Sequence, residues 1–310
     1  MKNIKTQQLR YFVAVYKIGS ITAAARQVNA TQSGVSMQIR EFEENLGLTL
    51  FERVSTGVKP TKAGELIYRR ANRILREIDE FENDVKLHKG QPYGSVRAGI
   101  MPTFSRSILA PTLIEFAEHY PFVEVKVIEG YSETLTAKVA NEELDFAIVP
   151  AAPLPVGVRS THVDTDIEVL AQSNAGGDLP AAHTELATSP PLKLALPGGG
   201  NARRPKIDRY LQNVCQSDHT ILELDSMMAT FDLLAQGNYA SIFPGCLCIS
   251  KLDDPKTKLS PIRNPALTVD YLLIEPSTKA TSPIVSAFEE ALCDCIKRTC
   301  DQGRAAFLDS

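Results

Sequence analysis

From Glu65 to about Lys89 the chain contains neither proline nor glycine, so one helix can run through the whole stretch. Apolar side chains recur within it at alternating steps of four and three residues, as a heptad seam of nearly three repeats. The seam consists of Ile67, Ala71, Ile74, Ile78, Phe81 and Val85. It favours a two-helix coiled coil between subunits, and the alternative is a helix that packs on its own domain. This helix divides the chain into a short head and a longer body.

The head shows helical spacing of apolar residues in three short segments. The first contains Leu9, Phe12, Val13 and Tyr16, the second Ile21, Ala24, Ala25 and Val28, and the third Val35, Ile39, Phe42 and Leu46. Ser20 and Thr31 are placed to cap the second and third helices, and Gly19 ends the first. Small alanines in the second segment allow the close helix crossing of a helix-turn-helix.

The first half of the third helix presents a polar surface without acidic residues before Glu41. Hydroxyls and a helix N-terminus suit phosphates, while glutamine and arginine can reach base edges in a major groove. A β-prone hairpin over residues 50–61 follows as a wing that can place Arg53 or Lys59 on the phosphate backbone. The predicted DNA-binding residues are Thr31, Gln32, Ser33, Ser36, Gln38, Arg40, Arg53 and Lys59. The alternative for the helix is an ordinary solvated face.

Charge is distributed unevenly between head and body. Residues 1–90 hold 15 basic and 10 acidic residues, a net charge of +5, whereas the whole chain carries −4 and the remainder therefore −9. A basic module on an acidic body is typical of a DNA-binding head joined to a part that does not bind DNA.

The segment from Leu9 to Gly64 resembles the DNA-binding region of LysR-type transcriptional regulators. The matching pieces are FVAV, GSITAAA, TQSGVSMQI, LFER and PTKAG, in the family's order and spacing. The resemblance implies a winged helix-turn-helix, a double-stranded DNA operator as partner and a dimer linked through the long helix. It also implies a tetramer assembled through sensor-domain pairs, and RNA polymerase is a further candidate partner. The chain departs from the family pattern at Ser33-Gly34 and at Met37.

The body begins after Gly90–Gly94 and alternates strand-like and helix-like segments. Strands are predicted at 95–100, 123–129, 145–149, 193–196, 220–224, 239–243 and 269–274, and helices at 103–120, 134–141, 205–214, 226–236 and 283–300. This rhythm predicts parallel sheets with ligands at the C-terminal ends of the strands. The predicted fold class is thus α/β multidomain, with a winged helix-turn-helix at residues 1–64, a linker helix at 65–90 and an effector domain at 91–310.

The body resembles the two-lobed, periplasmic-binding-protein-like sensor domain of the same regulators. The matching features are FxxxYPFVEVKVIEGYSETL, LDFAIVP and QGNYASIFP. Lobe I is expected at about 91–164 and 268–310, and lobe II at about 165–267. A small organic anion would bind in the cleft between the lobes as the effector that modulates operator binding. By resemblance the cleft residues are Met101, Pro102, Thr103, Phe104, Tyr131, Ser132, Gly199, Gly200, Asn201, Ser226, Met227, Phe243 and Pro244.

Other classes of function lack their signatures. The five histidines are scattered and no Ser/His/Asp, Cys/His, metal or dinucleotide pattern is recognisable, so no enzyme, cofactor or metal is predicted. The six cysteines, at 215, 246, 248, 293, 295 and 300, are predicted to be reduced structural thiols, with redox sensing as the alternative. A transport-type binding protein would need a signal peptide. With no run near the roughly 20 apolar residues of a membrane span, the expected location is the cytoplasm.

Overall fold

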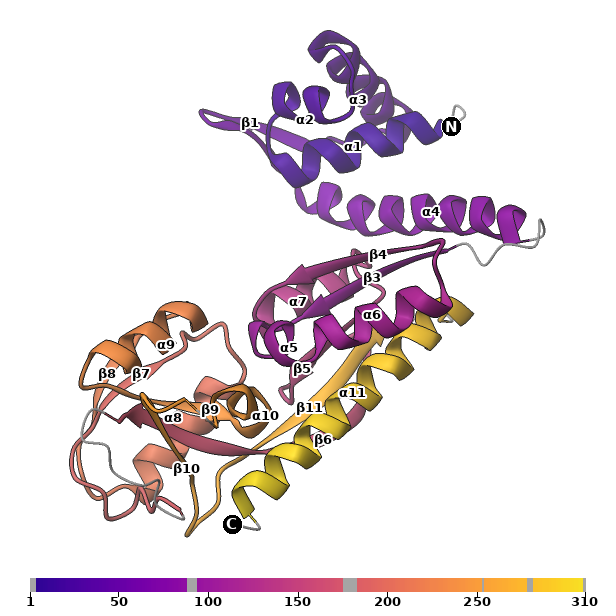
Figure 1. Ribbon diagram of the computed structural model, residues 1–310. Helices are drawn as coiled ribbons and strands as arrows, with labels where there is room; N and C mark the ends of the chain where they lie inside the picture. The colour runs from indigo at the N-terminus through magenta and orange to yellow at the C-terminus, as the bar shows by residue number, and fades with distance from the viewer. Residues whose placement is uncertain (1–3, 88–93, 175–182, 253, 278–280, 309–310) are drawn as a thin grey trace. The chain divides into compact units, whose positions relative to one another are not determined.

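Short polar residues and glycines set the limits of the helices in the head. Ser20 and Thr31 each accept a hydrogen bond from the backbone amide three residues further on, and Gly19 and Gly47 end helices in the left-handed conformation. They bound α1 (Thr6–Ile18), α2 (Ile21–Gln27) and α3 (Gln32–Leu46) in the computed structural model (Figure 1). The structure describes residues 4–87, 94–174, 183–252, 254–277 and 281–308.

The wing is a hairpin of β1 (Phe51–Val54) and β2 (Gly57–Pro60). It is tied to the end of α1, because the Val58 amide donates a hydrogen bond to the carbonyl of Gly19 at 2.8 Å. Gly57 has a φ of 140°, and a Cβ at this position would lie 2.3 Å from the Gly19 carbonyl oxygen. Only glycine therefore permits this close approach of the wing to the helical core.

The long helix α4 (Lys62–Leu87) shares the core of the head. Tyr68 and Ala71 are buried there, and Tyr68 stacks on Tyr16 with ring centroids 3.7 Å apart. Ala71, predicted for the intersubunit seam, thus packs inside its own unit, and Ile67 packs partly against the same core. The rest of the seam is open: Ile78 is half-buried, and Ile74, Phe81 and Val85 are exposed. The predicted end of the helix near Lys89 lies outside the described residues.

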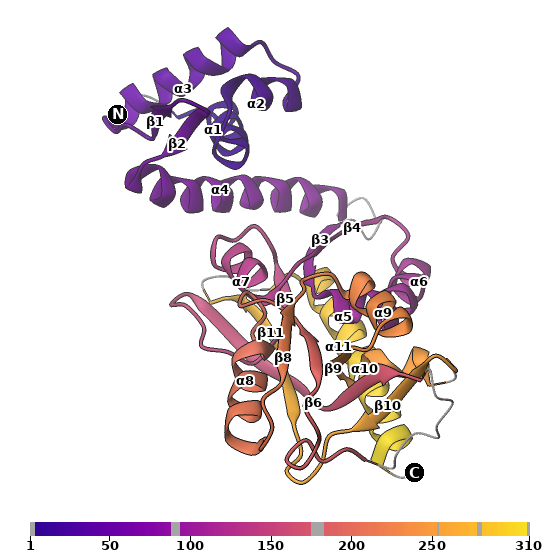
Figure 2. The same cartoon turned by 90° about the vertical axis from the view of Figure 1, so that its left-hand side faces the viewer.

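Two compact units result, the first ending at Gly94 and the second containing the rest of the chain apart from residues 141–143. The second unit is one continuous run of paired strands in the order β4-β3-β5-β11-β6-β9-β7-β8, with β10 also paired to β6 (Figure 2). No helix among the described residues is both long and apolar enough to cross a membrane.

Lobe I of this unit is a sheet flanked by helices (Figure 1). Its strands are β3 (Gly94–Ile100), β4 (Val123–Glu129), β5 (Phe146–Pro150) and β11 (Thr268–Pro276). Its helices are α5 (Pro102–Ser107), α6 (Leu109–His119), α7 (Ser132–Ala140) and α11 (Pro283–Leu308). Most of these elements follow the sequence prediction, but α11 continues beyond Cys300 to Leu308. The parallel pairing of β3 with β5 agrees with the βαβ interpretation.

The single helix predicted over 103–120 is divided in two. α5 ends at Ser107 and α6 begins at Leu109. Pro111 explains the break, because proline has no amide hydrogen for the carbonyl of Ser107 and its ring would clash with that carbonyl in a continuous helix. Pro111 is tolerated where it lies, in the first turn of α6.

Lobe II repeats the α/β pattern around a second sheet. Its strands are β7 (Lys193–Leu196), β8 (Thr220–Glu223), β9 (Ala240–Pro244) and β10 (Thr257–Pro261). Its helices are α8 (Arg203–Val214), α9 (Met227–Gln236), α10 (Gly245–Cys248) and a 3-10 turn (Ile249–Lys251). β10, α10 and the 3-10 turn were not expected from the sequence.

Strand β6 (Val158–Ser173), also unexpected, joins the two lobes. Ile167 still pairs with Thr268 of β11 in lobe I, and the next residue, Glu168, pairs with Pro244 of β9 in lobe II. The lobe I pairing therefore extends slightly beyond the boundary expected near residue 164. Beyond this crossing point β6 is covered on both faces. The first half of β6 is polar and lacks the alternation of apolar and polar residues that is typical of a half-buried strand.

Candidate nucleic-acid interface and ligand cleft

The exposed face of α3 provides the surface that the sequence predicted for DNA. Ser33, Met37 and Arg40 follow one another at helical spacing on the side opposite the buried Val35 and Ile39. All three are exposed, and Met37, at 57% exposure, lies between the two polar residues. Sequence reasoning treated Met37 only as a departure from the family pattern. Its position on the helix, one turn after Ser33 and one turn before Arg40, was the signal that could have identified it.

The remaining residues of the third helix that were predicted to bind DNA differ in how exposed their side chains are and in whether those side chains already make hydrogen bonds within the protein. Gln32 is exposed at the first turn, and Ser36 is half-buried beside the exposed face. The hydroxyl of Thr31 accepts the Gly34 amide at 3.2 Å, so it caps the helix. Gln38 is half-buried off the exposed face and donates to Glu41 at 3.1 Å. Arg40 makes an exposed ion pair with Glu44 at 3.6 Å, which is a weak restraint.

The two basic residues of the wing lie on opposite faces of the hairpin. Arg53 pairs with Val58 and Glu52 with Lys59 in the antiparallel register. Because cross-strand partners share a face and neighbours alternate, Arg53 and Lys59 point in opposite directions. Both are exposed. Only Lys59 has an acidic residue directly across from it, which reduces the positive charge of its face.

A cleft lies where residues from the two lobes converge at the ends of several strands. Its lining comprises Pro102, Thr103, Tyr131, Ala195, Pro197, Asn201, Arg203, Leu224, Met227, Thr230, Ser241, Ile242, Phe243 and Leu247. Six of the predicted cleft residues are in this group: Pro102, Thr103, Tyr131, Asn201, Met227 and Phe243. The cleft has a volume of about 40 Å³, room for one or two water molecules.

Other residues predicted for the cleft do not line it. Met101 and Phe104 are buried in the lobe I core. Ser226 caps α9 by accepting the amide of Ala229 at 3.2 Å, and Pro244 occupies the N-cap position of α10. Ser132, Gly199 and Gly200 lie outside the lining, although Ser132 and Gly200 contact the opposite lobe.

Direct hydrogen bonds across the cleft hold the lobes together. The Tyr131 hydroxyl donates to the carbonyl of Asp225, and the Ala202 amide donates to the Ser132 hydroxyl at 3.3 Å. The Glu133 amide also donates to the carbonyl of Gly200, at 3.2 Å. The Tyr131 hydroxyl is a donor at neutral pH, and burial raises its pKa further. A ligand larger than one or two water molecules can therefore bind in the cleft only if the lobes separate or the lining side chains rearrange.

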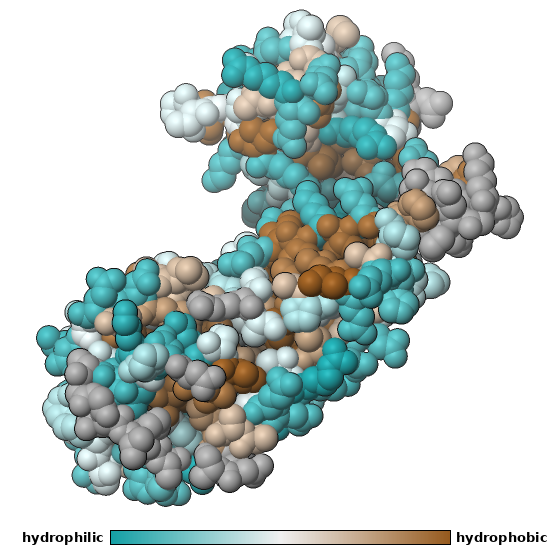
Figure 3. Space-filling model, viewed as in Figure 1, coloured by the Kyte–Doolittle hydropathy of each residue, from teal (hydrophilic) through white to brown (hydrophobic). Residues whose placement is uncertain are grey.

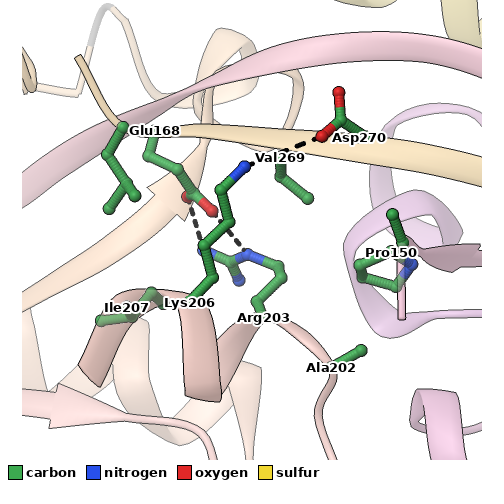
Figure 4. Close-up of a pocket in the computed structure, with 10 residues that line it drawn as sticks. Pro150, Glu168, Ala202, Arg203, Lys206, Ile207, Val269 and Asp270 are labelled. Atoms are coloured by element: carbon green, nitrogen blue, oxygen red, sulfur yellow. Dashed lines mark hydrogen bonds and ion pairs between the residues drawn. The ribbon is translucent and has the colours of Figure 1, made fainter. Parts of the chain in front are cut away.

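An ion pair between Arg203 and Glu168 lies beside this cleft, and Arg203 is part of the lining. Figure 4 shows the pair in a second pocket, which shares Arg203 with the cleft and is also lined by Glu168, Lys206 and Asp270. Arg203 donates from Nε and Nη2 to the two carboxylate oxygens at 2.8 and 2.6 Å, and from Nη2 to the Ile242 carbonyl at 2.9 Å. Burial alone would lower the pKa of Arg203, but the adjacent carboxylate outweighs it and the pKa is raised. Although arginine side chains are mostly solvent-exposed, Arg203 is only 5% exposed. It lacked a visible partner because β6 was not predicted.

A helix-turn-helix with an exposed polar face and a wing, joined to a two-lobed α/β domain with a cleft, defines a ligand-responsive DNA-binding regulator. Residues 6–65 match the bacterial regulatory helix-turn-helix proteins of the lysR family, and residues 89–294 match the LysR substrate binding domain. The chain therefore belongs to the LysR family of transcriptional regulators. It combines a DNA-binding domain with an effector-binding domain, and its relatives are regulators, not enzymes.

Curated relatives match along most of their length. The chain is 27% identical over 292 residues to the nitrogen assimilation regulatory protein nac of Escherichia coli (strain K12), which covers 94% of both chains. It is 28% identical over 241 residues to the HTH-type transcriptional regulator YofA of Bacillus subtilis (strain 168), 78% of this chain and 81% of that protein. The fold is similar to that of a full-length OxyR variant from Pseudomonas aeruginosa, with a TM-score of 0.70 and 19% identity over 95% and 98% of the two chains.

Proposed function

We propose that this regulator reads its operator with the exposed face of α3 and responds to a small organic anion held between its lobes. The α3 surface is the observation that supports the first part. Gln32, Ser33 and Arg40 can meet phosphates and base edges in a major groove. Met37 adds an apolar side chain suited to a thymine methyl group. Acting on the chromosome, the protein would work in the cytoplasm, with RNA polymerase as a candidate partner.

Replacing Arg40 by alanine is expected to weaken operator binding by about 1–3 kcal/mol and to relax specificity at one base pair. Gln32→Ala should have an effect of the same size. Fluorescence anisotropy on an operator first selected from random duplexes, and on its single-base variants, measures both quantities. Glu44→Ala is the control, because it frees the Arg40 guanidinium and should not weaken binding. Wild-type affinity in both Arg40→Ala and Gln32→Ala would mean that α3 does not read the operator.

The opposite orientation of Arg53 and Lys59 allows a matched comparison within the wing. We expect Arg53→Ala to lower affinity about equally for all DNA sequences and to reduce the salt dependence by roughly one phosphate contact. Lys59→Ala should change neither if the Arg53 face lies on DNA, since Lys59 is on the opposite face of the hairpin and is paired with Glu52. Measuring the Kd for DNA at several salt concentrations, from low to moderate, distinguishes the Arg53→Ala variant from the Lys59→Ala variant. Equal losses in both variants would show that the wing does not lie with one face on DNA.

The assembly is proposed to be a dimer through α4 and a tetramer through the sensor domains. Ile74, Ile78, Phe81 and Val85 present an open apolar strip along α4 that a second copy of the helix would cover. In lobe I, Ile114 and Phe122 are 64% and 50% exposed, and apolar side chains gather over β4 and α6 (Figure 3). An exposed apolar patch of this kind suits a protein partner, here another sensor domain.

The chemistry of the cleft supports an anionic effector. The first turn of α9 brings backbone amides and a positive helix end to the lining, next to the hydroxyls of Thr103 and Thr230. The charge of Arg203 is already balanced by Glu168. The attraction would therefore come from dipoles and hydrogen-bond donors, which suits a singly charged carboxylate.

A thermal-shift screen of the full chain against small carboxylic acids tests this assignment. A ligand at one hundred times its Kd should add about 2.7 kcal/mol to the stability of the sensor unit. Methyl esters of the same acids serve as controls, because they keep the carbon skeleton and lose the charge. Stabilisation by the esters but not by the acids would contradict an anionic effector.

A further inference from the structure

Three side chains able to bind a metal converge where β6 passes from one sheet to the other. Asp166 lies on β6 beside the crossing point, Cys246 on α10 and Cys300 on α11. A carboxylate oxygen and the two Sγ atoms lie within 4.8 Å of one another. All three side chains are fully buried. The cluster thus joins the interlobe strand, lobe II and the C-terminal helix.

Two glycines make this convergence possible. A Cβ at Gly303 of α11 would lie 3.2 Å from the carbonyl carbon of Gly245, closer than most real contacts. A Cβ at Gly245 would lie 2.9 Å from Ile167 Cγ1. Arg304 then fastens the same end of α11 to β6 through Asp164, at 3.0 and 3.2 Å. The close approach of the α11 backbone to Gly245 and the Arg304–Asp164 ion pair thus bring Cys300 next to Cys246.

The carboxylate of Asp166 is oriented before any ligand binds. Its Oδ1 accepts the Ile167 amide and its Oδ2 the Cys246 amide, both at 2.8 Å. Each oxygen keeps a further lone pair, and metal-binding carboxylates are commonly fixed by such hydrogen bonds. The hydroxyl of Tyr271 lies 4.0 Å from Cys246 Sγ and offers a fourth donor or a hydrogen bond to a bound water.

We propose that Asp166, Cys246 and Cys300 bind one thiophilic divalent cation of the zinc type. Two sulfur ligands and one carboxylate oxygen are a donor set that Zn²⁺ accepts, and tetrahedral zinc requires its sulfurs about 3.8 Å apart. Both thiols release their protons on binding, and the resulting single negative charge lies near the cationic Arg203, which interacts electrostatically with Cys246. A disulfide between the two cysteines would use the sulfurs alone and would not involve the Asp166 carboxylate beside them.

A cation here would act as a second input, separate from the cleft. It would tie α11 and α10 to β6 at the point where the lobes join, and would thereby restrict changes in their relative orientation. Cys248 is equally buried but is not part of the cluster, and Cys293 lies elsewhere on α11. These two cysteines provide a control with the same number of thiols removed.

The test is a titration of the reduced, chelator-treated full-length protein with Cd²⁺, followed by the ultraviolet sulfur-to-metal charge-transfer band. We expect one equivalent per chain and competition by Zn²⁺. C246S/C300S should lose the band and bind at least about 100-fold more weakly, while C248S/C293S should retain both. Absence of binding, or equal binding by the two double variants, would overturn the proposal.

X-ray absorption of the wild-type protein with one equivalent of Zn²⁺ gives an answer that needs no substitution. Two sulfur neighbours at about 2.3 Å together with oxygen ligands are expected. A coordination shell with fewer than two sulfurs would overturn the assignment even if Cys246 variants fail to fold. Neither result bears on operator or anion binding, which depend on other residues.

Discussion

Arg203→Ala should destabilise the sensor unit by about 3–5 kcal/mol, because the substitution leaves the buried carboxylate of Glu168 without its partner. The bidentate contact and its burial, with side-chain exposures of 5% and 2%, make this one of the costliest ion pairs to break in the described part of the chain. For a unit of this size the melting temperature should fall by about 10 °C. Thermal unfolding followed by circular dichroism measures the change.

Two further variants distinguish a broken pair from general damage to α8. Lys206→Ala removes a charge from the same helix, but its ion pair with Asp270 is long, at 3.7 Å, and nearly half exposed, so stability should change by less than about 1 kcal/mol. Replacing both members of the buried pair, as Glu168→Leu with Arg203→Met, should recover most of the loss. If the Arg203→Ala variant had the same melting temperature as the wild type, the Arg203–Glu168 ion pair would not contribute to stability.

Ile74→Asp should convert the protein to species that lack the α4 pairing, because a carboxylate would be placed inside the apolar strip of the dimer. Ile74 is 47% exposed in the single chain, so the head should still fold. Losing the linkage between two heads should weaken binding to a two-fold symmetric operator by about 100-fold or more. Light scattering measures the mass, and anisotropy measures the affinity.

Arg69→Asp is the matched control, since it introduces the same group on an exposed position away from the strip. It should leave the mass unchanged. A variant Ile74→Asp that kept its wild-type mass would place the dimer contact elsewhere on the molecule.

Local signals predicted the head well because its structure is set locally. The caps at Ser20 and Thr31 and the end at Gly19 follow from residue chemistry within one turn. Ala71 shows the limit of periodicity: a heptad position also faces the core of the head, and spacing alone cannot separate the two surfaces of one helix. The orientation of Arg53 and Lys59 depended on strand register, which the sequence did not specify.

The strands of the body could be predicted where they are short and apolar. They were harder to predict where a strand contains buried polar residues that are satisfied by partners elsewhere in the fold. Glu168 is stabilised inside the protein by Arg203, and Asp166 by backbone amides, so neither looks like a core residue in the sequence. Once β6 was missed, the environment of Arg203 could not be inferred. Cys246 and Cys300 are brought together only by the packing of α11, whereas spacing arguments consider cysteines that are close in sequence.

The path of the chain through the lobes also sets the order in which they can be completed during synthesis. The chain leaves lobe I along β6 and returns along β11, so lobe II is an insertion within it. The core of lobe I needs Val96 of β3 and Phe288 of α11 together. At typical translation rates the roughly 120 residues between β5 and β11 take about 6–24 s to emerge. During that time β3 and β5 have been synthesised but α11, which packs against the same core, has not. Loss of α11, the last helix of the chain, would therefore disrupt lobe I, whose first strands are synthesised early.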